Sequence, residues 1–306
     1  MTLSLLCAGQ GHQRRGMFHI FEGARAADPI FDAAAALLGQ DPRQFVAEAP
    51  SEALYANRAS QLLCVTSALV AAACLAPPPL IVAGYSVGEM AAWGVAGVWS
   101  AETTLRLTAR RAELMDMADS GGGLGFVRGL DRAEVEALVP EFRCAIAIVN
   151  PDRLFIIGGD RADIAACCDE ALSRGATSAR PIEVHVASHT QRLTPAVALF
   201  DQALRDSIAV RPAPGRDLLS ASSGRLVGEP ATGLFGLAAQ LATTINWAEA
   251  LNALVERGVE RMLEIGPGDA LSGMVRSAYP TLAVRSLDDF RSIDGARNWI
   301  AAGGRY

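Results

Sequence analysis

Five residues, Gly84-Tyr85-Ser86-Val87-Gly88, have the pattern of a turn that presents a reactive serine. Four apolar residues, 80–83, precede the turn, and a segment with helical spacing follows it. Strand, tight turn and helix in this order is the context of a nucleophile elbow, which lifts the serine hydroxyl above the sheet. The free N–H groups at the start of the helix would face the group that Ser86 attacks. The alternative for this pattern is a glycine-rich turn without a catalytic role.

A serine hydroxyl becomes a good nucleophile when a base accepts its proton, and histidine is the usual base. The chain has four histidines: His12, His19, His185 and His189. His12 lies in a glycine-bracketed loop after the first apolar segment, and His189 lies where a new helix begins. In an α/β-hydrolase the histidine comes late in the chain, so the absence of histidine after residue 189 disfavours an ordinary esterase or lipase. A purely local role for His189 is the alternative to that of a base.

Two further patterns concern a metal and an anion. His185 and His189 have the spacing of ligands on one helix face, but their segment alternates like a strand and lacks a matching acidic or thiol ligand, so we predict no metal site. Arg111 lies on a predicted helix with apolar spacing. It either pairs with Glu113 or Asp116, or points into a cleft, where its planar guanidinium would bind a carboxylate through two hydrogen bonds.

The elements that must position these residues indicate an α/β fold. Apolar segments near 3–8, 80–83, 218–220, 260–265 and 282–287 are predicted strands, with helices between most of them. Between 124 and 190 short elements follow in the order β-α-β-β-α-β, which is ferredoxin-like, with Ile182–Val186 as the last strand. We therefore predict a large domain from residues 1–123 and 190–306 and an inserted small domain from residues 124–189.

Composition excludes several classes of function. The 306 residues carry a net charge of −6, which disfavours binding to nucleic acid. All 27 basic residues are arginine, so Schiff-base chemistry on a lysine is excluded. The six cysteines lie mostly in apolar segments and form no Cys-x-x-Cys pair, which is typical of reduced cysteines in a cytoplasmic protein. We expect neither a signal peptide nor a membrane-spanning segment, because no apolar run is long enough to cross a bilayer.

Taken together, these residues resemble the family of acyltransferases that move malonyl groups from coenzyme A to acyl carrier proteins. The resemblance extends over nearly the whole chain, with order and spacing preserved across Gly9-Gln10-Gly11-His12-Gln13, Gly84–Glu89, Arg110-Arg111, Asn150-Pro151, Val186–His189 and Glu264–Gly268. It implies Ser86 as the acyl nucleophile, His189 as the general base and Arg111 as the clamp for the malonyl carboxylate. It also implies that the backbone amides of Gln10 and Val87 form the oxyanion hole, and that the large domain is hydrolase-like with a mostly parallel central sheet.

Three positions depart from the usual pattern of this family. Tyr85 stands where most members have His, His12 where most have Ser, and Asn246 where most have Gln. By the resemblance, the backbone carbonyl of Asn246 is expected to orient the catalytic histidine. The segment Gly84–Glu89, followed by Ala91-Ala92-Trp93, is most similar to the epsilon subunit of bacterial malonate decarboxylase.

The resemblance implies an enzyme that loads malonyl from malonyl-CoA onto the phosphopantetheine-type thiol of an acyl carrier subunit, with other malonate decarboxylase subunits as possible partners. No permanently bound cofactor is expected, since the coenzyme A thioester is a substrate. Malonyl transfer in fatty-acid or polyketide synthesis is an alternative. A serine hydrolase that uses water as the acceptor is a second alternative, and a non-catalytic carrier-binding or scaffolding subunit is a third.

Overall fold

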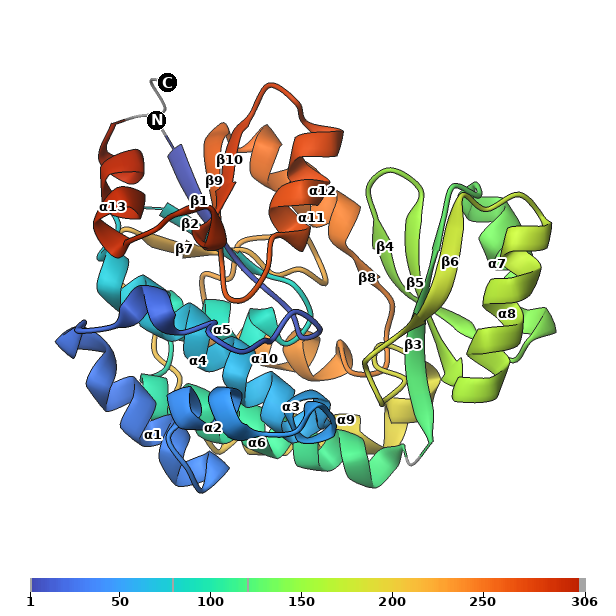
Figure 1. Ribbon diagram of the computed structural model, residues 1–306, viewed down its shortest axis with the longest axis horizontal. Helices are drawn as coiled ribbons and strands as arrows, with labels where there is room; N and C mark the ends of the chain where they lie inside the picture. Colours follow the sequence, from blue (N-terminus) through green and yellow to red (C-terminus); the bar gives the residue numbers. More distant parts are fainter. Residues whose placement is uncertain (1, 79, 120, 303–306) are drawn as a thin grey trace.

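The computed structural model describes residues 2–78, 80–119 and 121–302. Residues 1, 120 and 303–306, which the sequence assigns to the large domain, lie outside the described residues, as does residue 79. The chain forms a large lobe and a small lobe, each built on its own five-stranded sheet (Figure 1). Residues 122–182 supply four strands of the small sheet.

The sheet of the large lobe is entirely parallel. Its strands lie in the order β10-β9-β1-β2-β7, with parallel pairing between all neighbours. Their bounds are β1 (Thr2–Cys7), β2 (Leu80–Gly84), β7 (Arg216–Leu218), β9 (Val259–Ile265) and β10 (Ala283–Ser286). The strands β1 and β2 are buried almost throughout, as expected for parallel strands covered on both faces. In register, Cys7 pairs with both Gly84 and Ile265, so the carboxyl ends of three central strands meet at one edge.

Helices cover this sheet in layers. The helices α4 (Asn57–Leu75) and α5 (Gly88–Val95) pack directly on its strands, while α1 (Asp28–Leu38) and α6 (Ala101–Ala118) pack on α4 from outside. Both α11 (Trp247–Glu256) and α12 (Ala270–Ala278) contact β9. The remaining helices are α2 (Pro42–Glu48), α3 (Ser51–Tyr55), α9 (Thr194–Arg205), α10 (Pro230–Ala239) and α13 (Ile293–Ala301). Within the described residues only α4 is long and apolar enough to cross a bilayer, but 78% of it is buried in the lobe, as in a core helix.

The small lobe has the predicted order of elements. It contains β3 (Gly122–Arg128), α7 (Arg132–Glu141), β4 (Ala145–Asn150), β5 (Leu154–Asp160), α8 (Arg161–Ser173) and β6 (Ser178–Ile182). The four strands lie antiparallel in the order β6-β3-β5-β4, and both helices lie on one face (Figure 1). The expected ferredoxin-like fold of this part is therefore confirmed.

The last strand of the small lobe begins earlier than the sequence suggests. The alternating segment Ile182–Val186 was the expected strand, yet β6 ends at Ile182. The β3 strand pairs with β6 from Leu124↔Ile182 to Arg128↔Ser178, so the strand includes Pro181. Proline is tolerated there because β6 is an edge strand.

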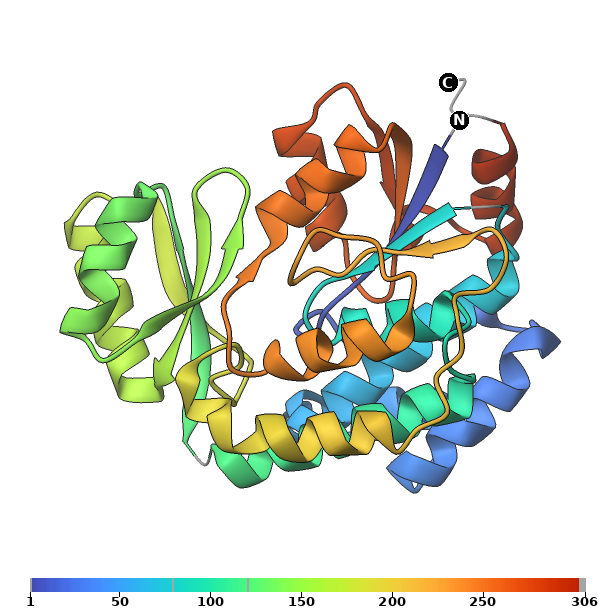
Figure 2. The same ribbon diagram turned by 180° about the vertical axis from the view of Figure 1, so that it is seen from behind.

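A short strand from late in the chain joins the two lobes. Residues of β8 (Ile245–Asn246) pair in parallel with β4, through Ile148↔Ile245 and Val149↔Asn246. From both sides of the molecule β8 lies beside β4, just before α11 (Figures 1 and 2). Since β8 belongs to the large domain by sequence and to the small sheet by hydrogen bonding, the domain boundaries at residues 124 and 189 stay a prediction.

Candidate active site

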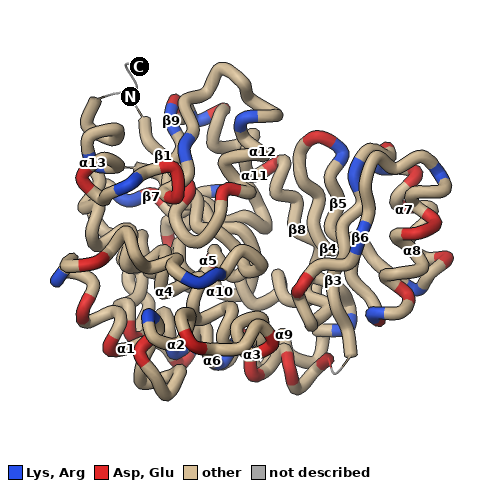
Figure 3. The backbone as a smooth tube through the Cα atoms, viewed as in Figure 1, with Lys and Arg blue, Asp and Glu red and all other residues tan. Residues whose placement is uncertain are grey.

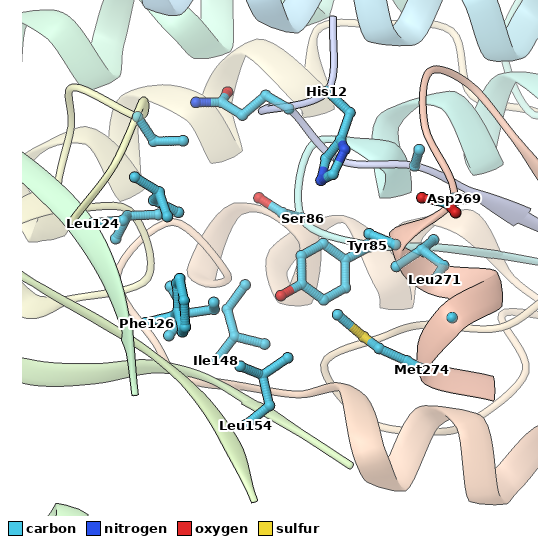
Figure 4. Close-up of a pocket in the computed structure, with 18 of the residues that line it drawn as sticks. His12, Tyr85, Ser86, Leu124, Phe126, Ile148, Leu154, Asp269, Leu271 and Met274 are labelled. Atoms are coloured by element: carbon cyan, nitrogen blue, oxygen red, sulfur yellow. The ribbon is translucent and has the colours of Figure 1, made fainter. Parts of the chain in front are cut away.

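Ser86 lies at a turn whose geometry requires the two flanking glycines. Its φ of 54° is in the left-handed region, between the end of β2 and the start of α5. A Cβ atom on Gly84 would lie 2.1 Å from the backbone oxygen of Gly88, and one on Gly88 would lie 2.1 Å from the oxygen of Cys7. The turn therefore folds tightly enough to point the Ser86 side chain away from the sheet, into a cavity between the lobes (Figure 4).

His189 is in hydrogen-bonding contact with the serine. Its Nε2 lies 2.7 Å from the Oγ of Ser86, and its Nδ1 lies 2.6 Å from the backbone oxygen of Gln240. A carbonyl only accepts hydrogen bonds, so Nδ1 carries the proton and Nε2 is the acceptor for the serine hydroxyl. The backbone of His189 has a φ of 62° and donates to the oxygen of Leu241 at 2.8 Å. Both ends of the imidazole are thus held in the orientation that a general base requires.

The carbonyl that orients His189 is not the expected one. It belongs to Gln240, which follows the last residue of α10, whereas Asn246 was the sequence-based expectation. The last carbonyls of a helix have no partner within the helix, so the end of α10 offers a free acceptor at this point. Asn246 instead caps α11, because its side chain accepts a hydrogen bond from the backbone N–H of Glu249 at 3.3 Å.

Burial keeps the imidazole neutral. His189 is 1% exposed, and this burial, followed by the nearby positive charge of Arg111, lowers its pKa to about 3. The hydrogen bond to Gln240 acts in the opposite direction. An imidazole with so low a pKa is unprotonated at neutral pH and available to accept a proton from Ser86.

Arg111 is a buried cation with an incomplete set of partners. On α6, its Nη1 donates to the Oε1 of Gln61 at 2.7 Å and lies 3.2 Å from the sulfur of Met115, while its Nη2 has no partner among the described residues. The side chain does not form the expected pairs with Glu113 or Asp116: Arg110 and Arg58 contact Glu113, and Asn57 contacts Asp116. Burial lowers the pKa of Arg111 to about 10. A buried guanidinium of this kind is stabilised when an anion binds its free nitrogen.

Two backbone amides near Ser86 are free to donate. Val87 lies at the N-terminus of α5, and Gln10 lies in the loop after β1. In the described part of the chain, neither N–H donates a hydrogen bond to another group of the protein. The positive end of the α5 dipole lies beside Ser86, so this region favours a developing negative charge.

The cavity beside Ser86 has a volume of about 600 Å³ and is lined by both lobes. Its small-lobe wall consists of one face of the antiparallel sheet, which is largely apolar near the serine: Leu124, Phe126, Ile148, Leu154, Ile156 and Ile182. Farther along the same wall are Arg128 on β3 and Arg180 on β6. Figure 3 shows basic positions, in blue, along β6. His189 and Arg111 do not line this cavity; both are buried, and His189 lines a second pocket together with Thr190 and Arg192.

Two of the three residues that depart from the usual family pattern, Tyr85 and His12, line this cavity (Figure 4). The ring of Tyr85 packs edge-on against Trp247 with centroids 5.3 Å apart, and burial raises the pKa of its hydroxyl well above the usual range. His12 lies on the opposite side, next to Gly268. His185 is turned away and contacts Glu183, so it does not join His189. No cluster of three metal-ligating side chains occurs among the residues that the structure describes.

Sequence reasoning missed three residues that support the site. Gln61 holds Arg111, Gln240 orients His189, and Glu89 contacts the side chain of Gln240. Gln61 is one of several polar residues in the mostly apolar helix α4, so the pattern marks it only as a candidate, and Glu89 directly follows the serine motif. Gln240 acts through its backbone, so its side-chain type gives no such signal.

Comparison with known proteins identifies the family. Residues 5–281 match the model of the acyl transferase domain, and the chain therefore belongs to the acyl transferase domain family. It is 25% identical to the malonyl CoA-acyl carrier protein transacylase of Bacillus subtilis, over 95% of each chain. It is 31% identical to the polyketide biosynthesis protein ThaF of Burkholderia thailandensis, over 98% of this chain.

The solved structures agree with this assignment. The acyl-carrier-protein S-malonyltransferase of Burkholderia pseudomallei superposes with a TM-score of 0.89 at 28% identity, covering 97% of this chain and all of that one. The predicted α/β fold, with a mostly parallel sheet and a second small domain, is confirmed. The chain spans 26% of the length of ThaF and 4% of polyketide synthase GfsB of Streptomyces halstedii, whereas it spans nearly the whole Bacillus subtilis transacylase.

Proposed function

We propose that this protein is a malonyltransferase that moves a malonyl group from malonyl-CoA to the thiol of an acyl carrier protein through a malonyl-Ser86 intermediate. The observation that carries the proposal is a buried arginine with a free Nη2 close to a Ser86–His189 pair in which the histidine is buried and the serine faces the cavity. A serine–histidine pair suits acyl transfer in general, and Arg111 adds the preference for an acyl group that ends in a carboxylate. The names of the Bacillus subtilis and Burkholderia pseudomallei relatives support this substrate class.

In the first step His189 Nε2 accepts the proton of Ser86, and the serine oxygen bonds to the thioester carbonyl carbon. The N–H groups of Gln10 and Val87 stabilise the resulting oxyanion; loss of one such donor in other enzymes costs about 3 kcal/mol of barrier. The C–S bond then breaks, and His189 returns the proton to the sulfur of coenzyme A. In the second step the carrier thiol gives its proton to His189, attacks the malonyl ester, and releases Ser86 with that proton.

Arg111 supplies the selectivity in this proposal. A malonyl carboxylate beside Nη2 would complete the hydrogen bonds of the guanidinium, whereas an acetyl group would leave the buried charge unpaired. Leaving one partner of a buried pair without its counter-charge costs about 3–5 kcal/mol. Malonyl-CoA is therefore preferred over acetyl-CoA at the acylation step.

The cavity wall suits the long arm that carries the thioester in both substrates. Its apolar tract runs along β3 from Leu124 to Arg128, four residue steps that span about 13 Å of strand. The pantetheine chain would lie on this tract, with its phosphate near Arg128 and Arg180. The same groove would accept coenzyme A and the carrier arm in turn, so that no permanently bound cofactor is needed.

The finer assignment concerns the carrier. We propose the acyl carrier subunit of a malonate decarboxylase as the acceptor, on the similarity of Gly84–Glu89 to its epsilon subunit. Carriers of fatty-acid or polyketide synthesis are the alternative, which the names ThaF and GfsB of two relatives favour. Transfer rates to purified carriers of the three kinds decide between them. The predicted cytoplasmic location stays a prediction.

The decisive experiment is intact-protein mass spectrometry after brief mixing with malonyl-CoA or acetyl-CoA. We expect one malonyl adduct on the wild type, none on Ser86→Ala, and a lost or acetyl-selective adduct on Arg111→Ala. An adduct that persists until a pantetheine thiol is added supports a transferase. Release of free malonate without a thiol would indicate a serine hydrolase instead, and absence of both adduct and malonate would indicate a non-catalytic subunit.

A further inference from the structure

Glu89 is a buried carboxylate that the mechanism above does not use. It lies on α5, three residues after Ser86, and is 1% exposed. Burial of an ionisable group is costly unless a specific partner compensates it. Here the partners are uncharged: the side-chain Nε2 of Gln240 donates to the Oε2 of Glu89, and weaker contributions come from the backbone of Ala221 and the side chain of Ser220.

Gln240 connects this carboxylate to the catalytic histidine. Its backbone oxygen accepts the Nδ1 proton of His189 at 2.6 Å, while its side chain contacts Glu89. The only other contact of that side chain is a long one, 3.5 Å to the Oγ of Ser222, within the described part of the chain. The backbone N–H of Glu89 donates to the oxygen of Ser86 at 2.9 Å. Serine, histidine, glutamine and glutamate thus form a closed ring of hydrogen bonds.

We propose that Glu89 is a positioning residue for His189, an inference that rests on the proposed acyl transfer. Glu89 anchors the side chain of Gln240, and this anchor holds the Gln240 carbonyl in line with Nδ1 of His189. The tautomer with a free Nε2 is thereby maintained, as a carboxylate does directly in a serine–histidine–aspartate triad. Here the carboxylate, that of Glu89 on α5, does not contact the imidazole itself but acts on it through Gln240.

The charge of Glu89 matters because a hydrogen bond to a carboxylate is about twice as strong as one between neutral groups. Burial raises the pKa of Glu89 to about 7. Hydrogen bonds to the carboxylate, of which that from Gln240 is the largest, partly oppose this rise. Arg111 on α6, with a pKa of about 10, and His189, with a pKa of about 3, do not titrate near neutrality.

Of the elements packed against α5, β1 and α4 carry buried thiols, and α6 carries Asp116, whose pKa is raised by burial. Burial raises the pKa of the Cys7 thiol on β1 far above its usual range and that of Cys64 on α4 to about 12, so both stay neutral. The β2 strand, Leu80–Gly84, has no titratable side chain. Glu264 on β9, which lines the cavity, also has a pKa that burial raises to about 7, so only the part of a neutral inflection that Glu89→Gln removes reports the ionisation of Glu89.

The test measures how fast a fluorophosphonate probe labels Ser86, which requires His189 but not the malonyl group or its clamp. Gln240→Glu places two carboxyl groups against each other, and we expect its labelling to be about tenfold slower than that of the wild type. The double variant Glu89→Gln/Gln240→Glu restores the bond with donor and acceptor exchanged, and we expect recovery to within about threefold. Ser222→Ala, which removes only the long contact of Gln240, is the matched control and should label at the wild-type rate.

A second measurement does not depend on a disruptive variant. The wild-type labelling rate should fall as the pH decreases through 7, while the isosteric Glu89→Gln should lack this inflection. Equal labelling of Gln240→Glu and the wild type, no recovery in the double variant, or an unchanged inflection in Glu89→Gln would each overturn the positioning role. If the wild type labels as expected but forms no malonyl adduct, the proposed function fails and the positioning of His189 stands.

Discussion

Replacing Arg111 by methionine should make the folded protein more stable and at the same time impair its reaction with malonyl-CoA. Burial lowers the pKa of Arg111 from 12.5 to about 10. This difference means that folding disfavours the charged guanidinium by roughly 3 kcal/mol at neutral pH. Because the folded-state pKa is the lower one, the cost is complete below pH 10 and disappears only as the pH rises towards 12.5.

The same substitution removes a useful contact, and the net gain is therefore smaller. Arg111→Met leaves the Oε1 of Gln61 without its donor, which costs about 1–2 kcal/mol. The expected net stabilisation is about 1–2 kcal/mol, or a melting temperature raised by about 2 °C per kcal/mol. Acylation by malonyl-CoA should fall by a factor of roughly 150 to 5,000, which corresponds to the cost of about 3–5 kcal/mol for breaking a buried ion pair.

Differential scanning calorimetry in a Ser86→Ala background checks both halves of this argument, since this background binds malonyl-CoA without being acylated. Without ligand, the Arg111→Met variant should melt higher than its parent; with malonyl-CoA, only the parent should gain stability. Arg110→Met is the matched control, because Arg110 lies on the same helix, is 45% exposed and pairs with Glu113 at the surface. A lower melting temperature for Arg111→Met, or equal stabilisation of both proteins by malonyl-CoA, would refute the reasoning.

Three other predictions concern Ser86, Asn246 and His189. Ser86→Gly should be about 1 kcal/mol more stable than Ser86→Ala in urea unfolding, because glycine adopts the φ of 54° without strain. Asn246→Ala should lose about 0.5–1 kcal/mol of stability with the loss of the α11 cap, yet be acylated at the wild-type rate, since the carbonyl on His189 belongs to Gln240. The unfolding free energy should decrease as the pH falls from 6.5 towards 3, because the unfolded chain protonates His189 first; His189→Gln should lose this part of the slope.

Each of these predictions has an outcome that would contradict it. Equal stability of the two Ser86 variants would mean that the turn is not strained. Slow acylation of Asn246→Ala would indicate that α11 helps to position the histidine. An unchanged pH slope in His189→Gln would mean that other groups cause the acid sensitivity.

The serine turn was predictable because its constraints are local. Gly84 and Gly88 are required by backbone contacts within five residues and with the adjacent strand β1. The parallel strands were equally visible, since strands buried on both faces are continuous apolar runs. The order of elements in the small lobe also followed directly from the pattern of short alternating segments.

The orienting carbonyl was not predictable in the same way. Its identity depends on where α10 ends relative to His189, and any residue type at position 240 provides a backbone oxygen. The early start of β6 has a comparable cause, because Pro181 argues against a strand until the strand is known to be at an edge. Two-residue strands such as β8 are too short to leave a periodic pattern.

The pairing of β8 with β4 has a consequence for the protein while it is being synthesised. β4 ends at Asn150 and β8 begins at Ile245, so the ribosome adds about a hundred residues between them, and at about 5–20 residues per second this takes roughly 5 to 20 seconds. Throughout this interval the N–H and C=O groups along the free edge of β4 are unpaired, so another nascent chain can form hydrogen bonds with them. Cells that slow translation within this stretch should therefore produce more aggregated protein from the same messenger RNA.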